Sequence, residues 1–200
     1  MVFELSFDIF LLIKSKSETD TGFLALIFKI CMSKIQHRKR DCRMPYEKKT
    51  AKEKLLDSKG LPKIEKISPK QEKVWGKGTI VIPAPVEVDE IMRNVPKGRI
   101  ITINKIRERL ARKHKATIGC PICTGIFASI SARAAEEDRE SGATTITPWW
   151  RTLKEGGVLN PKYPGGEQNQ KKLLENEGFE IIKKGKRYVV NNFERYLMEV

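Results

Sequence analysis

The residues Thr147-Pro148-Trp149-Trp150-Arg151 place two adjacent tryptophans between a proline and an arginine, and the rest of the fold must accommodate both rings. Pro148 has a fixed φ and disfavours helical geometry in the residue before it, so we expect the rings to follow a rigid turn. Two indoles held in this way either fill a core or wall a pocket. Arg151 beside them either contacts a phosphate or pairs with an acidic neighbour such as Glu177.

Three helices are predicted in the sequence that precedes the tryptophans. The first covers Val86–Val95, where apolar residues recur at helical spacing. Thr102 is a suitable N-cap for the second helix, whose cations point outward. The third begins at Gly119-Cys120-Pro121 with proline in its first turn and ends at Ser141-Gly142. Its inward, apolar face is expected to consist of Ile122, Ile126, Phe127, Ile130 and Ala134.

The sequence after the tryptophans predicts one more helix and a hairpin. Gln168–Asn176 is typical of a short helix, and Phe179–Lys183 and Arg187–Val190 are candidate strands around a turn at Lys184-Gly185. The order helix, tight turn, helix, predicted for the sequence before the tryptophans, suggests a helix-turn-helix. We therefore predict a mainly α fold, a winged helix-turn-helix-like domain with a small C-terminal β-hairpin.

The sequence before residue 86 has a different character. Residues 1–43 are expected to be a non-functional or disordered extension from an over-extended start, and residues 44–85 a basic, partly flexible arm before the domain at 86–200. The apolar runs Phe7–Ile13 and Phe23–Ile30 are shorter than the ~20 residues of a membrane span. Neither run has the flanks of a secretory leader, so we expect a cytoplasmic protein with no membrane contact.

The net charge of +14 is the strongest global signal, because a cationic surface favours polyanionic partners, chiefly nucleic acid. Four cysteines are too few to form a disulfide framework in 200 residues. Cys120 and Cys123 form a CxxC at a helix start, where a thiol pKa is lowered and half a zinc site could form. No second CxxC accompanies them, so no metal or cofactor is expected.

Five motifs occur in an order that is informative even though no single one is specific. Together they resemble the DNA-binding domain of the methylated-DNA–protein-cysteine methyltransferases (O6-alkylguanine-DNA alkyltransferases) and of the alkyltransferase-like proteins, over about residues 86–180. The motifs are Val95–Asn104, Ile118–Ile126, Ile146–Arg151, Tyr163–Gly166 and Leu173–Gly178.

The resemblance implies an active site that lacks the residues that carry out alkyl transfer in the family. In the family, a proline is followed by the alkyl-acceptor cysteine, its activating histidine and an arginine; here the cysteine and histidine positions are Trp149 and Trp150. An indole carbon does not replace a thiolate nucleophile, so alkyl transfer is not expected at this position. Alkyltransferase-like proteins also carry tryptophan for the cysteine but typically keep the histidine. The degenerate pocket implied consists of Trp149, Trp150, Arg151, Tyr163, Gly165, Gly166 and Glu177.

The resemblance also implies a DNA-binding surface. The helix from Pro121 would enter a groove, with the small Thr124 and Gly125 allowing close approach. The family's nucleotide-rotating tyrosine, which follows a Thr or Ser, falls on Ile103 after Thr102, and its stack-filling arginine falls on Pro121. Both side chains that serve base flipping in the family are therefore replaced here. Phosphate contacts are expected from Arg99, Lys105 and Arg107.

The function expected is therefore that of a monomeric, non-catalytic DNA-binding protein of this family. It would recognise alkylated or damaged DNA for repair and work there with a protein partner. One alternative is an RNA-binding or protein-interaction module that kept the fold and lost lesion recognition. A second alternative is a thiol-dependent activity at Cys120 and Cys123.

Overall fold

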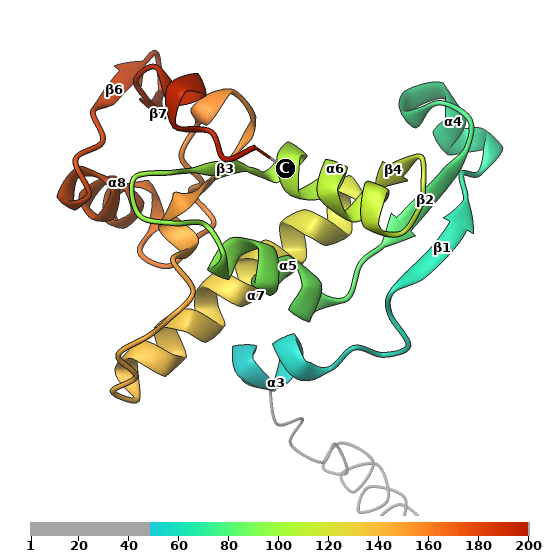
Figure 1. Cartoon of the computed structure of the whole chain (residues 1–200), viewed down its shortest axis with the longest axis horizontal. Helices are drawn as coiled ribbons and strands as arrows, with labels where there is room; N and C mark the ends of the chain where they lie inside the picture. The colour runs from blue at the N-terminus through green and yellow to red at the C-terminus, as the bar shows by residue number, and fades with distance from the viewer. Residues whose placement is uncertain (1–48, 200) are drawn as a thin grey trace, which may run out of the picture. The chain divides into compact units, whose positions relative to one another are not determined.

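The 20-residue helix α7 (Pro121–Glu140) is the element against which α3 (Ala51–Leu56), α5 (Pro85–Arg93) and α6 (Ile103–Lys113) all pack (Figure 1). The structure is a computed structural model and describes residues 49–199. The extension predicted for residues 1–43 lies outside these residues. The mainly α fold predicted from the sequence is confirmed, and the strands form only small sheets.

The helix starts follow from local capping. The Thr102 hydroxyl accepts a hydrogen bond from the Lys105 backbone N–H at the start of α6, as predicted. Pro85 and Pro121 occupy the first positions of α5 and α7, where a missing N–H costs nothing. The remaining helices are α4 (Pro69–Trp75) and α8 (Gly166–Asn176), with 3₁₀ turns η1 (Trp149–Arg151), η2 (Glu155–Gly157) and η3 (Phe193–Tyr196).

Residues 49–199 form three small sheets, and two of them connect parts of the chain that are far apart in sequence. The first has the order β1 (Lys63–Lys66), β2 (Thr79–Ile82), β4 (Ile118–Gly119), with β1 antiparallel and β4 parallel to β2. The second pairs β3 (Ile101–Thr102) with β5 (Thr152–Leu153) in parallel. The third is the antiparallel hairpin of β6 (Ile181–Lys184) and β7 (Arg187–Val190), which confirms the predicted C-terminal hairpin.

Among residues 49–199, regular, packed structure begins at Ala51 rather than at Val86, which corrects the prediction of a flexible arm over residues 49–85. The Glu137 carboxylate of α7 accepts hydrogen bonds from the backbone N–H groups of Ala51 (2.8 Å) and Lys52 (2.9 Å), and so caps α3. Val81 of β2 is fully buried. Backbone pairing and a few apolar side chains are enough to order this segment, while its many lysines stay in solvent.

The inward face of α7 differs from the one predicted. Ile122 and Ile126 are 61% and 52% exposed. Small residues let α5 and α6 approach the helix axis closely, so the face that carries them is the one that packs. The buried residues of α7 are Thr124, Ala128, Ser131, Ala132, Ala134 and Ala135.

The core consists of a main cluster and two smaller ones. The main cluster lies among α5, α6 and α7 and contains Met92, Ile106 and the fully buried Trp149. A second cluster lies under α8 and the β6–β7 hairpin, and Trp150 packs against both. A third joins Ile67 and Ile80 to Cys120, with Trp75 packed on it. Within residues 49–199, no helix has the length and apolar character needed to cross a membrane.

Candidate nucleic-acid interface

The first of the two tryptophans is a core residue in this structure. Trp149 opens the 3₁₀ turn η1 after Pro148 and has no exposed surface. Its indole N–H donates to Glu136 of α7 at 2.8 Å. Its ring meets Trp150 edge to face at 5.9 Å between centroids and the buried Tyr163 at 5.5 Å. The polar atom of Trp149 is thus satisfied, and a base cannot reach its ring without rearrangement.

The second tryptophan belongs to a buried ionic network. The Trp150 indole N–H donates to Glu177 Oε1 at 2.8 Å. The Arg151 guanidinium donates to both oxygens of Glu177, and their side chains are only 13% and 10% exposed. Arg151 Nη1 also donates to the backbone carbonyl of Val95 at 2.6 Å. Of the two sequence interpretations of Arg151, the structure shows the pairing with Glu177.

The loop between η2 and α8 is fixed by its glycines and by one buried amide. Gly165 has a φ of +70°, and a Cβ at this position would lie 2.6 Å from the Cβ of Asn169. Gly166 also has a positive φ and begins α8. Gln170 accepts a hydrogen bond from the Asn160 backbone N–H of this loop at 2.7 Å and donates to the backbone carbonyls of Trp150 and Thr152, both at 3.0 Å. Burial raises the pKa of Tyr163, so its phenol stays neutral. The predicted pocket residues therefore come together, but as a packed cluster.

The polar and small residues of the predicted DNA-binding set lie at separate places on and beside α6 and at the start of α7. Arg107 Nε donates to the Gly119 carbonyl at 3.0 Å, which holds its guanidinium beside the start of α7. Lys105 pairs with Glu108 at 2.9 Å, and the exposed Arg99 donates to the Arg195 carbonyl. Pro121 and Gly125 are both partly exposed, and a Cβ on Gly125 would meet nothing within 4 Å. This surface is open to a partner.

Three members of the predicted set face the protein interior. Thr124 is fully buried and donates to the Cys120 carbonyl at 2.7 Å, so its side chain points to the core rather than to a groove. Thr102 is 6% exposed because it caps α6. Ile103 packs against the main core cluster. Their roles are structural in this conformation.

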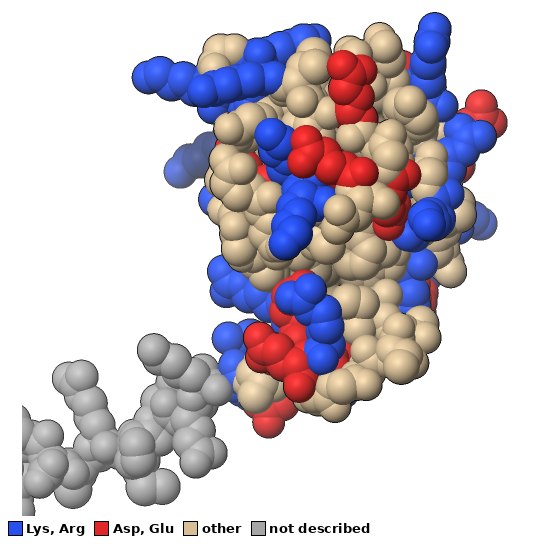
Figure 2. Space-filling model, turned by 90° about the vertical axis from the view of Figure 1, so that its left-hand side faces the viewer, with Lys and Arg blue, Asp and Glu red and all other residues tan. Residues whose placement is uncertain are grey.

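The β6–β7 hairpin carries cations that the sequence interpretation had not placed at the site. Lys183, Lys184, Lys186 and Arg187 are all exposed and surround the turn glycine Gly185, whose φ is +62°. Figure 2 shows the side of the molecule that lies on the left in Figure 1. Lysine and arginine side chains gather along the upper edge and sides of this face, with carboxylates between them. The sequence pattern that could have identified this cationic hairpin is the run of four cations around one glycine.

The acidic end of α7 is occupied by intramolecular contacts. Glu136 accepts from Trp149 and pairs with Arg139. Glu137 caps α3, and Asp138 pairs with Lys52 at 2.6 Å. These carboxylates therefore hold other elements in place.

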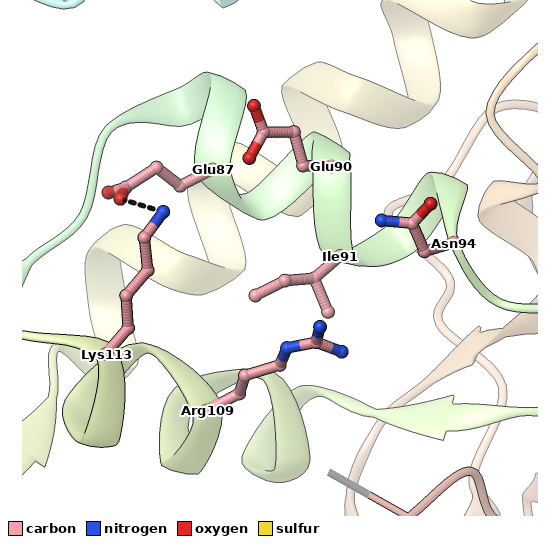
Figure 3. A pocket seen from close by; sticks show the side chains of 6 residues that line it. All are labelled: Glu87, Glu90, Ile91, Asn94, Arg109 and Lys113. Atoms are coloured by element: carbon pink, nitrogen blue, oxygen red, sulfur yellow. Dashed lines mark ion pairs between the residues drawn. The ribbon is translucent and has the colours of Figure 1, made fainter.

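A separate hollow of about 300 Å³ lies between α5 and α6 (Figure 3). Glu87 on its rim accepts from Lys113 Nζ at 2.7 Å and from the Ala84 backbone at 3.0 Å, and His114 Nε2 lies 2.8 Å away. Burial raises the pKa of Glu87, but these hydrogen bonds outweigh it and hold that pKa below its usual value. The cluster ties α5 to α6, and neither tryptophan lines the hollow.

Cys123 of the CxxC motif does not have the low pKa expected of a reactive thiol. The Cys123 backbone N–H donates to Cys120 Sγ at 3.4 Å, and Cys120 is buried. Burial raises the pKa of Cys123 to about 11, and hydrogen bonding to Cys120 adds to the rise. Desolvation thus outweighs the helix N-terminus, which corrects the expectation of a lowered pKa.

Alkylation of Cys123 by iodoacetamide at pH 8 is expected to be on the order of 100-fold slower than that of glutathione, because only thiolate reacts. The rate should rise about tenfold per pH unit towards pH 11. Site-resolved mass spectrometry of labelled peptides measures it. Labelling of Cys123 as fast as glutathione would restore the thiol-enzyme alternative.

Comparison with known proteins gives two structures and no sequence relative. No family model and no curated protein matches the chain. One similar solved structure is that of S. pombe Atl1 in complex with damaged DNA containing O6-carboxymethylguanine, 23% identical with a TM-score of 0.41. The other is S. pombe ATL in complex with DNA, 24% identical with a TM-score of 0.43. Each match covers 58% of this chain and 94% of the other.

Proposed function

We propose that this protein is a non-catalytic DNA-binding protein that recognises alkylated or damaged DNA, with α6 and α7 as a helix-turn-helix and the β6–β7 hairpin as its wing. The observation that carries the proposal is the open face of α7. Between Pro121 and Ala135 this helix has no carboxylate, and Arg107 lies beside its start. Such a face accepts a polyanion at close range. The ordered motifs of residues 86–180 support the same reading.

The chemistry of the degenerate site supports binding rather than alkyl transfer. Where the motif would supply a thiolate, Trp149 is buried and donates its N–H to Glu136. The raised pKa of Cys123 leaves that thiol protonated at neutral pH, so it is a poor acceptor. A damaged base would be sensed through Trp150, because this ring is the partly exposed one of the pair.

The proposed DNA contacts divide into two groups. Arg99, Lys105 and Arg107 lie on or just before α6 and would contact phosphates beside the groove that α7 enters. The four hairpin cations around Gly185 would contact the backbone further along the duplex. Contacts to phosphate position the protein without reading sequence.

The deciding experiment is fluorescence anisotropy with a duplex that contains either guanine or O6-methylguanine at one position, at several salt concentrations. The expected result is salt-dependent binding with tighter affinity for the damaged duplex. Equal affinity for both duplexes would contradict the proposed recognition of damaged DNA. Equal or tighter binding of an RNA duplex would favour the RNA-binding alternative, and no binding to either nucleic acid would overturn the proposal.

The double variant Lys184→Ala/Lys186→Ala is expected to lower the salt dependence, the slope of log K against log salt, by about two, because each phosphate contact contributes about one. The matched control is Lys54→Ala/Lys59→Ala, on and just after α3, which lies at the bottom of the view, while the hairpin lies at its upper left (Figure 1). A control slope that falls equally would show that only net charge matters.

A further inference from the structure

The strand β1 forms an exposed edge of the sheet β1–β2–β4. Its residues, Lys63–Lys66, are all exposed, and β2 pairs with it on one side only. Figure 1 shows β1 on the right-hand side of the view, with β2 on its inner side. A strand edge of this kind presents backbone groups to which another strand can add. None of its residues belongs to the proposed DNA contacts.

The backbone N–H and C=O groups of Ile64 and Lys66 point away from β2. In an antiparallel pair of strands, residues that bond to the partner strand alternate with residues that do not. The Ile67 N–H donates to the Gly78 carbonyl at 3.0 Å, in the same register as the β1–β2 ladder. Every second residue before Ile67 therefore bonds to β2, and the residues between them face outward.

The hydrogen bonds of β2 on its other side give the same assignment. Thr79 lies opposite Lys66, and its N–H donates to the Thr117 hydroxyl next to β4 at 3.1 Å. Val81 lies opposite Ile64, and its carbonyl accepts from the N–H of the residue after β4 at 2.9 Å. Among the described residues, the outward backbone groups of Ile64 and Lys66 have no hydrogen-bond partner.

The surface around this edge is strongly cationic. Residues 59–77 contain six lysines and two glutamates, and Glu65 is already paired with Lys63 at 2.6 Å. On the strand itself one apolar side chain interrupts the charge, because Ile64 is 49% exposed. The edge therefore offers backbone pairing, two cations and one apolar contact. The six lysines, all exposed, are Lys59, Lys63, Lys66, Lys70, Lys73 and Lys77.

The charges select one kind of partner among those that could meet a strand edge. A second copy of this chain in antiparallel register would place Lys63 opposite Lys66 twice, and like charges directly opposite each other destabilise a sheet. Nucleic acid phosphates accept hydrogen bonds but cannot donate to the outward carbonyls, so half of the edge would stay unpaired. An extended peptide segment with carboxylates opposite both lysines satisfies the backbone and the charges together.

We infer that β1 is a docking site for an extended acidic segment of another protein, which adds to the β1–β2–β4 sheet as a further strand. In antiparallel register the segment carries an acidic residue opposite Lys66, an apolar residue opposite Ile64 and a second acidic residue opposite Lys63. The position opposite Glu65 is free of these requirements. This docking site acts independently of the proposed DNA contacts, because it shares no residue with them.

The test is fluorescence anisotropy of the full-length protein with a labelled peptide whose core is Glu-Thr-Val-Glu, in which valine would lie opposite Ile64. The valine N–H would donate to the Ile64 carbonyl, whereas the threonine N–H would point away from β1. N-methylation of the valine amide is expected to weaken binding about 10-fold, because one hydrogen bond is lost. N-methylation of the threonine amide is the matched control and should leave binding unchanged, since both peptides keep the same side chains and charge.

Two variants test the same edge from the side of the protein. Ile64→Pro removes an outward N–H and leaves the ladder to β2 intact, so it should weaken binding by about 10-fold more than Ile64→Ala. Lys63→Glu/Lys66→Glu should abolish binding, because each carboxylate of the peptide would meet a like charge. The matched control is Lys162→Glu/Lys172→Glu, before and on α8, which lies on the left of the view, away from β1 (Figure 1).

Three results would overturn the docking site. The first is no binding of the core peptide. The second is an equal loss of affinity from the two N-methylated peptides, which would show that charge alone attracts the peptide. The third is a Lys63→Glu/Lys66→Glu variant that binds duplex DNA more weakly and the peptide as well as before, which would assign these lysines to nucleic acid. Far-UV circular dichroism verifies the folding of each variant, and the N-methylated peptides test the edge on the unaltered protein.

Discussion

Replacing Glu177 by alanine is expected to lower the free energy of unfolding by about 3–5 kcal/mol, the usual cost of removing one partner from a buried ion pair. The variant leaves the Arg151 guanidinium buried without a counter-charge and removes the acceptor of the Trp150 indole N–H. Arg151 also loses its orientation towards the Val95 carbonyl, which connects η1 to the segment before β3. Urea denaturation followed by tryptophan fluorescence measures the change.

Two further variants show that the effect comes from burial and geometry. Arg151→Lys should be destabilising as well, because an ammonium cannot form the two-pronged contact with a carboxylate. Arg151→Met/Glu177→Leu should cost less than the sum of its single variants, since neither charge is left alone. Glu108→Ala breaks the exposed pair with Lys105 and is the control, with an expected change below about 1 kcal/mol. A Glu177→Ala variant as stable as Glu108→Ala would contradict the buried-pair interpretation.

Replacing Trp149 by alanine is expected to cost about 3–5 kcal/mol, as large-to-small changes of aromatic core residues do. The side chain is fully buried in the main cluster and contacts the rings of Trp150 and Tyr163 edge to face. Thermal and urea denaturation measure the loss. The result separates the two interpretations of the tryptophan pair. If Trp149 is a core residue, its replacement lowers stability, whereas if it lines a pocket, its replacement lowers the affinity for DNA.

Trp149→Phe isolates the indole hydrogen bond. It keeps most of the apolar volume but removes the N–H that donates to Glu136, so we expect an intermediate loss of about 1–2 kcal/mol. Trp150→Phe is the control, because the Trp150 ring is the partly exposed one. The same variant tests whether this ring senses a damaged base. A Trp149→Ala variant of unchanged stability with weakened binding to damaged DNA would show that the ring opens to a pocket in solution.

Local signals predicted the helices and the hairpin because each depends on a few neighbouring residues. Thr102 caps α6, Pro121 opens α7, and Gly185, with its positive φ, allows the turn of the hairpin. The pairing of Arg151 with Glu177 was also predictable, because the motifs place an arginine and a glutamate where a buried charge needs a partner.

Long-range contacts were not predictable from local patterns. Between residues 49 and 85 the lysines hide the strand pattern, and Val81 is buried in the main core cluster on a strand that pairs with β4, 38 residues later. The face of α7 was misassigned because apolarity suggested Ile122 and Ile126, whereas helix packing favoured the small residues. The position of Trp149 could not be predicted from local patterns either, because its indole N–H donates to Glu136, 13 residues earlier in the chain.

The pairing of distant segments has a consequence for how the chain folds. β2 aligns with β4, β3 aligns with β5 about 50 residues onward, and Ile100 bridges to Leu197 near the end of the described chain. Each parallel contact closes a long loop before any pairing energy is gained. The α6–α7 pair is therefore expected to reach its final packing slowly and cooperatively, after Ile100 has paired with Leu197.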